Sequence, residues 1–253
     1  YQGKYSKDFK VNMKENFIKK FGKPGVHFPE DHIDLKSWGA SDDQAKKMID
    51  EALDSEKSHD RKDAIKHPKA TVDHITKALN DEDDDVRVYA IQHPNATKDH
   101  ITKALDSTNW YTRCHAIQHP KVTVDHITKA LGDEHYYVRQ AAIEHSKATV
   151  DHITKALDDE DMLVRKAAIQ HPKATKNQIA KALNNEHYYV RESAIQNPNA
   201  TKDHITKALD DEDYRVRKSA IEHPKATKDH ITKALKDIDS DVRSAARKRM
   251  KDF

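Results

Sequence analysis

Residues 71–96 read TVDHITKALNDEDDDVRVYAIQHPNA, and this 26-residue unit decides the fold because it recurs along most of the chain. Its motif DHITKAL, at 73–79, returns at 99–105, 125–131, 151–157, 203–209 and 229–235, and in altered form as NQIAKAL at 177–183. Eight copies start near Ser41, and no insertion interrupts the period. A fixed period of this length is typical of repeat proteins built from stacked units.

The first half of each unit predicts a short helix, which we call helix A. Ile75, Ala78 and Leu79 stand at i, i+3 and i+4, so they share one face of a helix. Thr71 precedes this segment as the expected N-cap, and Asp73 places a carboxylate in the first turn, where it favours the positive helix end.

The second half predicts another helix, helix B. The acidic stretch 81–85 interrupts the apolar pattern, and Val86, Ala90 and Ile91 then form a second apolar stripe. Pro94 ends this helix, because the residue before a proline avoids the α region. Neither helix is long enough to be stable alone, so stacking must stabilise both.

These patterns predict an all-α fold, an α-solenoid (superhelix) of eight 26-residue helix-pair repeats over residues 41–253. Only 36% of the residues are hydrophobic and 35% are charged, which suits a thin apolar seam between layers better than a thick globular core. In the final copy Arg247 and Met250 replace Ile and Pro, so we expect this repeat to cap the stack.

Residues 1–40 do not follow the repeat. Phe9, Met13, Phe17 and Phe21 are spaced by four, which predicts a helix with one aromatic side, followed by a loop. We expect this segment to be an N-terminal helical cap that covers the first repeat. A docking segment for a partner is the alternative.

Composition limits the functional classes. A net charge of +2 gives no bulk electrostatic reason to bind nucleic acid or an anionic membrane. The single cysteine, Cys114, excludes an internal disulfide and suits a reducing compartment. No signal peptide and no membrane-length apolar run occur, so we expect a soluble cytoplasmic protein. The chain begins at Tyr1, from which we expect that an N-terminal segment has been removed.

The string VRxxAIxHPxATxDxIxxAL resembles the HEAT-like superfamily of helical repeats, and it looks most like the leucine-rich repeat variant type. The resemblance covers residues 41–250 and implies a right-handed superhelix that binds macromolecules. Repeats of the variant type are typically shorter, and their second helix can be a 3₁₀ helix. An accompanying iron–sulfur module would need a cysteine cluster that this chain lacks. HEAT-like repeats also build some DNA glycosylases.

The two residues that open helix B vary between copies, so the scaffold does not fix them. At about 100° per residue, Tyr111, Tyr137, Leu163 and Tyr189 point away from the buried stripe, with Tyr136 at its margin. In HEAT-like stacks helix B lines the concave side. Exposed aromatic rows favour partner binding; packing of the rings between neighbouring B helices is the alternative. The candidate partner-binding residues are Trp110, Tyr111, Tyr136, Tyr137, Leu163, Tyr188, Tyr189 and Tyr214.

The loops between repeats carry Lys and His, whereas the turns within repeats carry Asp, so the two edges should differ in sign. Helix A N-termini at the basic edge could attract anions, although the Asp73 series screens that field. The candidate anion-binding residues are Lys121, Lys147, Lys173 and Lys202. A solvated, mutually screening surface is the alternative.

No catalytic motif is present, and we expect neither an enzyme nor a cofactor. Equivalent histidines are one repeat apart, too far to share a metal ion, so we expect no metal. The Arg87 series should form charge-assisted bonds along the stack. The sequence therefore predicts a non-enzymatic scaffold that binds a protein or peptide on the concave helix-B face. The alternative is a nucleic-acid binder, including a DNA glycosylase-like one, that uses aromatic stacking and the Lys/His-rich edge.

Overall fold

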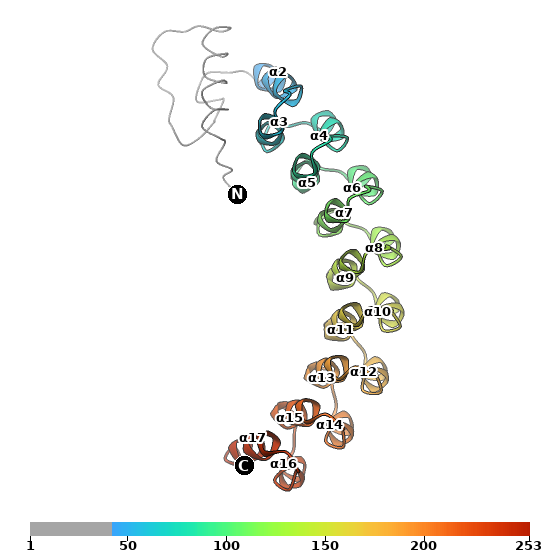
Figure 1. The fold of residues 1–253 in the computed structure, drawn as a ribbon, viewed down its shortest axis with the longest axis vertical. Helices are drawn as coiled ribbons and strands as arrows, with labels where there is room; N and C mark the ends of the chain where they lie inside the picture. The colour runs from blue at the N-terminus through green and yellow to red at the C-terminus, as the bar shows by residue number, and fades with distance from the viewer. Residues whose placement is uncertain (1–41) are drawn as a thin grey trace, which may run out of the picture. The chain divides into compact units, whose positions relative to one another are not determined.

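The computed structural model describes residues 42–253, which form eight helix pairs and no strand (Figure 1). The A helices are α2 (Asp42–Leu53), α4 (Val72–Ala78), α6 (Lys98–Ala104), α8 (Val124–Ala130), α10 (Val150–Ala156), α12 (Lys176–Ala182), α14 (Lys202–Ala208) and α16 (Lys228–Ala234). The B helices are α3 (Ser58–Ile65), α5 (Asp84–Gln92), α7 (Trp110–Ile117), α9 (Tyr136–Glu144), α11 (Met162–Gln170), α13 (Tyr188–Gln196), α15 (Tyr214–Glu222) and α17 (Ser240–Met250). The predicted all-α solenoid of helix pairs is confirmed. The predicted cap at 1–40 lies outside the described residues, so the division at residue 40 stays a prediction.

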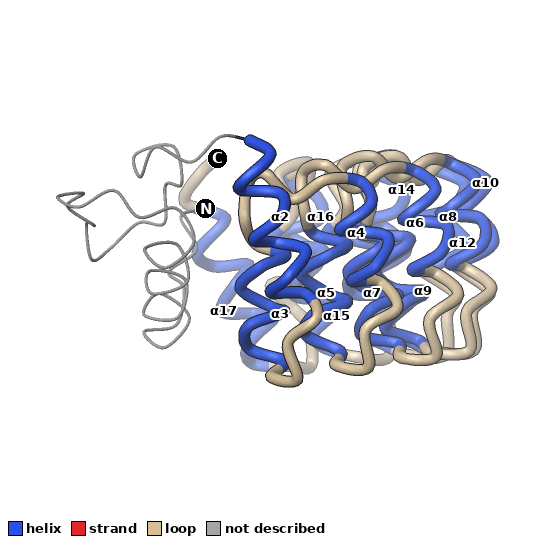
Figure 2. Tube along the Cα trace, turned by 90° about the horizontal axis from the view of Figure 1, so that it is seen from above, coloured by secondary structure: helices blue, strands red, loops and turns tan. Residues whose placement is uncertain are grey.

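The described residues divide into two compact units, 42–122 and 123–253. Within each unit consecutive B helices pack side by side, and each also packs on the A helix of its own pair. In the second unit, the layer of B helices lies on the inner side of that unit's curve (Figure 1). Figure 2 shows the turns gathered at the ends of the helices.

A reciprocal capping box begins each A helix from α4 onward. In α10 the Thr149 hydroxyl accepts from the His152 amide at 3.3 Å, and His152 Nδ1 accepts from the Thr149 amide at 3.2 Å. Because Nδ1 accepts, the ring carries its proton on Nε2, which donates to the Thr128 hydroxyl of the preceding repeat at 2.8 Å. The predicted threonine N-cap is confirmed, with histidine where a capping box usually has Glu or Gln.

The B helices are α-helices, not the 3₁₀ helices that the family resemblance allows. In α5 the helix ends at Gln92, and His93 adopts an extended conformation before Pro94 as predicted. In α17 no proline follows, and the helix continues to Met250. Arg247 on this last helix is exposed, as a terminal position requires.

The core is a seam of isoleucine and alanine repeated at every layer. One isoleucine from each helix between α2 and α16 is fully buried, as Ile153 and Ile169 are in α10 and α11. Alanines such as Ala156 and Ala168, 2% and 0% exposed, leave room for neighbouring helices to approach. Each repeat therefore stabilises its neighbours through a thin apolar layer.

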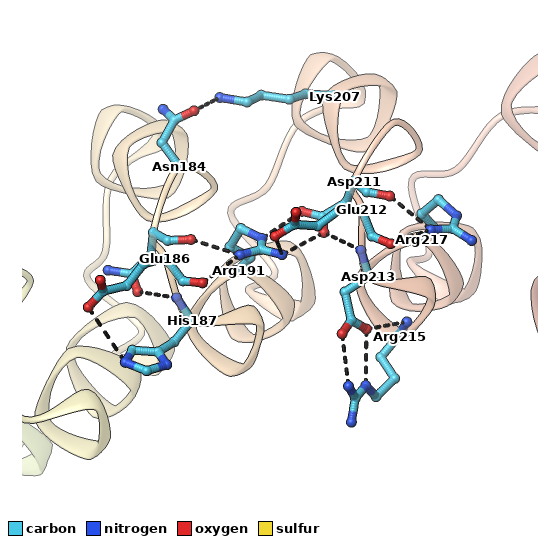
Figure 3. A network of polar contacts seen from close by, with 11 residues as sticks. Asn184, Glu186, His187, Arg191, Lys207, Asp211, Glu212, Asp213, Arg215 and Arg217 are labelled. Atoms are coloured by element: carbon cyan, nitrogen blue, oxygen red, sulfur yellow. Dashed lines mark hydrogen bonds and ion pairs between the residues drawn. The ribbon is translucent and has the colours of Figure 1, made fainter.

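Buried arginines of the B helices join consecutive repeats at the turns. Arg191 Nε and Nη2 donate to the two carboxylate oxygens of Asp211 in the next repeat, at 2.8 and 2.9 Å (Figure 3). The Arg191 Nη1 atom also donates to the carbonyls of Asn185 and Glu186 in its own turn. The predicted bonds along the stack are thus confirmed for Arg191, whereas Arg87 donates to the Asp81 and Glu82 carbonyls of its own turn.

No helix within residues 42–253 is long and apolar enough to cross a membrane.

Candidate partner-binding surface

The openings of several B helices carry exposed aromatic side chains. Tyr111, Tyr137 and Tyr189 are 45%, 44% and 42% exposed, and Trp110 and Tyr214 are both 38% exposed. Tyr136 and Tyr188 are half-buried, as expected of the margin of the stripe. Leu163 is also half-buried, so its predicted full exposure is wrong. We call Tyr136, Tyr137, Tyr188, Tyr189 and Tyr214 of the second unit the aromatic surface.

In the first unit, Trp110 and Tyr111 form a separate pair. Their ring centroids lie 5.7 Å apart at 79°, and Tyr111 meets His115 edge to face at 4.5 Å. Asn109 caps this helix by accepting from the Tyr111 amide. The pair is therefore held by edge-to-face contacts while it stays exposed to solvent.

In the second unit, two repeats present the same tandem tyrosines. The rings of Tyr136 and Tyr137 lie 4.1 Å apart and those of Tyr188 and Tyr189 lie 4.0 Å apart, both tilted by 33°. A hydrogen bond with Tyr137 raises the pKa of Tyr136 to about 12. Burial, followed by a hydrogen bond with Tyr189, raises the pKa of Tyr188 to about 12 as well. Both hydroxyls therefore stay protonated at neutral pH.

The tandem tyrosines follow a histidine where other B helices have a capping acid or amide. The N-caps of α9 and α13 are His135 and His187, and neither side chain makes a capping hydrogen bond. By contrast Asp161 and Asp213 cap α11 and α15. Loss of such a cap costs about 1 kcal/mol of helix stability. The two repeats with tandem tyrosines thus lack a stabilising N-cap bond that the neighbouring repeats have.

Arg215 binds to Tyr188 from the next repeat. Its guanidinium carbon lies 3.6 Å from the ring centroid, and Nη1 donates to the Tyr188 hydroxyl at 2.6 Å. Its Nε and Nη2 donate to the two carboxylate oxygens of Asp213 at 3.0 and 2.8 Å (Figure 3). This bond is the main reason that the pKa of Asp213 is lowered and that of Arg215 raised. Sequence reasoning missed this contact, because it depends on the offset between stacked repeats.

Exposed carboxylates border the aromatic surface. The turns before α11, α13 and α15 place Glu160, Glu186 and Glu212 in solvent, with side chains 85%, 77% and 83% exposed. The predicted acidic edge therefore adjoins the tyrosines. Each of the three glutamates also pairs with the buried arginine of the preceding B helix, at 3.1, 3.4 and 3.0 Å, so the negative charge that they present to solvent is partly balanced.

The lysines predicted as an anion-binding edge are exposed, but two of them are already engaged. Lys121 Nζ donates to the Pro94 and Ala96 carbonyls, both at 2.8 Å. Lys173 makes the equivalent pair of bonds at 2.8 Å to the preceding loop. Lys147 and Lys202 are exposed as well. The engaged ammonium groups tie one loop to the next, which supports the alternative of a structural surface.

The loop histidines were expected to add positive charge to that edge, and this expectation needs correction. His67, His93, His119, His171 and His223 are buried rather than displayed. In His93, Nδ1 accepts from the Asn95 amide, and Nε2 therefore donates to the His67 carbonyl at 3.1 Å. Burial lowers the pKa of His93, His171 and His223, which keeps these rings neutral.

Within residues 42–253, no group of three or more His, Cys, Asp or Glu side chains is placed to hold a metal ion. Cys114 is buried in α7. His93 and His152, whose pKa values are lowered, serve a loop and a helix cap, whereas His115 lies within α7 and bonds to the Gln92 side chain.

No protein-family model matches the chain, and no curated protein matches it. Among solved structures, it is similar to one described as a leucine-rich repeat variant with a novel repetitive protein structural motif. That likeness has a TM-score of 0.67 and 19% identity and covers 82% of both chains, so it shows the fold alone. YibA of Escherichia coli, with a TM-score of 0.45 and 17% identity, covers 79% of this chain and 98% of its own.

Proposed function

We propose that this helical repeat protein, which shares its fold with a leucine-rich repeat variant, is a non-enzymatic scaffold that binds a protein or peptide on its helix-B face. The anchors are the aromatic surface of the second unit and the Trp110–Tyr111 pair of the first. One observation carries the proposal: aromatic side chains 38–45% exposed occupy the helix-B openings, while the rest of the repeat is nearly constant.

Energetics favour a binding role for these rings. A tyrosine that is more than two-fifths exposed leaves much of its apolar area in water, where it adds little to folding. The same area becomes favourable once a partner covers it, and Tyr and Trp dominate the energy of many interfaces. His135 and His187 also stand where a capping side chain would stabilise the helix. Selection for stability alone does not account for these sequences.

Nucleic acid is the less favourable partner. Bases could stack on the tyrosines, but the carboxylates of Glu160, Glu186 and Glu212 beside them would repel the phosphate backbone. On the opposite edge, the ammonium groups of Lys121 and Lys173 are already bonded to backbone carbonyls, so they are less free to reach a phosphate. A protein surface or an extended peptide meets neither obstacle.

The test compares capture of partners from a lysate of the native host by immobilised variants. Tyr137→Ala combined with Tyr189→Ala should lose the captured protein, identified by mass spectrometry, while the wild type retains it. Val124→Ala combined with Val150→Ala is the matched control, because these valines are equally exposed, at 45% and 43%, but lie on A helices. Retention by the tyrosine variant would contradict the proposal. Binding of an oligonucleotide by the wild type, with an affinity that falls steeply as the salt concentration rises, would also contradict it.

A further inference from the structure

Arg215 shows how the aromatic surface holds a cation. Its guanidinium carbon lies 3.6 Å from the Tyr188 ring centroid, while Asp213 binds the same group at two points. Ring, hydroxyl and carboxylate thus act together on one arginine. The combination is a guanidinium site that the chain fills with its own side chain.

Equivalent residues occur two repeats earlier without the arginine, where the His135 ring stacks on Tyr136 with the centroids 5.3 Å apart. Tyr136 is equivalent to Tyr188, Asp161 to Asp213 and Leu163 to Arg215, each 52 residues apart. Leucine has neither charge nor hydrogen-bond donor, so it cannot make the contacts that Arg215 makes. The half-buried Leu163 leaves the Tyr136 site without an internal cation.

Asp161 is held in the same way as its counterpart. Its Oδ1 accepts from the Leu163 amide at 2.7 Å, and Asp213 Oδ1 accepts from the Arg215 amide at 2.8 Å. The 52-residue register gives Asp161 the same place relative to Tyr136 that Asp213, which binds Arg215 at two points, has relative to Tyr188. Glu160, exposed in the same turn, pairs with Arg139 at 3.1 Å.

We propose that Tyr136 and Asp161 bind an arginine side chain of the partner, in the position that Arg215 occupies on Tyr188. This inference rests on the proposed function and narrows it to a partner segment that carries arginine. Charge complementarity supports it, because the turns bordering the aromatic surface display carboxylates. Arginine fits better than lysine, since its planar group can stack on the ring and pair with both carboxylate oxygens.

The probe is N-acetylarginine amide, titrated into the full chain that carries ring-labelled tyrosine. Nuclear magnetic resonance follows the Tyr136 ring signal, assigned by Tyr136→Phe. N-acetylcitrulline amide is the matched probe, with the same shape and no charge. We expect saturable shifts at Tyr136 with the arginine probe and affinity roughly tenfold above that of the citrulline probe.

Two exchanged variants sharpen the test. Leu163→Arg should fill the site from within and abolish the response at Tyr136, because Arg215 already shows that arginine fits at this position of the repeat. Arg215→Leu should free the equivalent site at Tyr188 and produce saturable shifts of the Tyr188 ring signal with the arginine probe. Asp161→Asn should weaken the response while keeping the helix cap, since Asn109 caps α7.

Equal responses to both probes, or an unchanged response in Leu163→Arg, would overturn the arginine site. The partner assay separates this failure from that of the proposed function. Capture that is lost in the Tyr137 and Tyr189 variant, but kept in both Leu163→Arg and Asp161→Asn, would overturn the arginine site and leave the scaffold function standing. Capture of the partner by the variant that lacks Tyr137 and Tyr189 would contradict both the arginine site and the scaffold function.

Discussion

Arg191 and Asp211 stand 20 residues apart in the chain and form a two-point ion pair that links consecutive repeats, with both side chains less than 9% exposed. Arg61 and Asp81, Arg139 and Asp159, and Arg217 and Asp237 repeat this pair. The layer after Arg165 differs, because Asn185 stands where the aspartate would be. The buried Nε of Arg165 then has no hydrogen-bond partner.

This difference predicts that Asn185→Asp stabilises the protein. The new carboxylate would accept from Arg165 and satisfy its Nε, which we expect to add about 1–2 kcal/mol to the free energy of unfolding. Urea denaturation followed by circular dichroism measures the change. Asp211→Asn, which breaks the equivalent pair, should lose a similar amount. A urea midpoint for Asn185→Asp at or below that of the wild type would contradict the expected pairing of the new carboxylate with Arg165.

The buried histidines predict that the protein becomes less stable in mild acid. Burial lowers the pKa of the capping histidines His100, His152, His204 and His230, as it does for the loop series. Each ring is thus neutral when folded but takes up a proton near pH 6.5 when unfolded. Their contribution is present above pH 6.5 and falls as the pH drops below that value. Melting temperatures measured from pH 7.5 to pH 5 should decline accordingly.

The chain supplies its own control for this pH effect. Gln178 stands at the capping position of α12 and donates to the Thr154 hydroxyl at 2.8 Å, as His152 donates to Thr128. The variant His152→Gln should therefore keep the bonds but lose the titration. We expect it to show a shallower decline between pH 7 and pH 5 than the wild type. An identical decline would show that His152 carries none of the effect.

The uncapped start of α13 predicts a second stabilising change. His187→Asp would give this helix the N-cap that Asp213 provides for α15, where the carboxylate accepts from the Arg215 amide. We expect a gain of about 1 kcal/mol in the free energy of unfolding. Asp213→Ala, measured in parallel, should lose a comparable amount. If His187→Asp lowers the melting temperature, the histidine has a structural role.

Exposure predicts different costs for removing tyrosine and isoleucine. Tyr137→Ala and Tyr189→Ala should each change the free energy of unfolding by no more than about 0.5 kcal/mol. Ile169→Ala, at a fully buried position, should cost about 2–5 kcal/mol. Chemical denaturation of the three variants tests this. A core-like loss at Tyr137 would show that the ring belongs to the packing and not to a binding surface.

Much of the fold could be predicted because the repeat places the same caps, buried faces and helix ends in most of its copies. Thr71, Ile75 and Pro94 mark a cap, a buried face and a helix end, and the structure places all three as expected. The exposure of Tyr137 followed from its angle around the helix relative to the buried stripe. These are properties of one helix or one turn, which neighbouring residues decide.

The predictions that needed correction concern polar side chains that meet across repeats. Lys173 was expected to offer charge to an anion, yet its ammonium group binds carbonyls of the preceding loop. His93 was expected at a basic edge, yet it is buried and donates to the preceding layer. In both cases a flexible or titratable side chain forms hydrogen bonds with another repeat.

The sequence alone determined the period, the two helices of each repeat, their caps and the outward direction of the tyrosines. The tertiary structure decided the rest: the pairing of Arg191 with Asp211, the neutrality of the histidines and the cation–π contact of Arg215 with Tyr188. The physical reason is that periodicity fixes where a side chain leaves its own helix. Only the offset between stacked helices fixes which atoms of the next layer it meets.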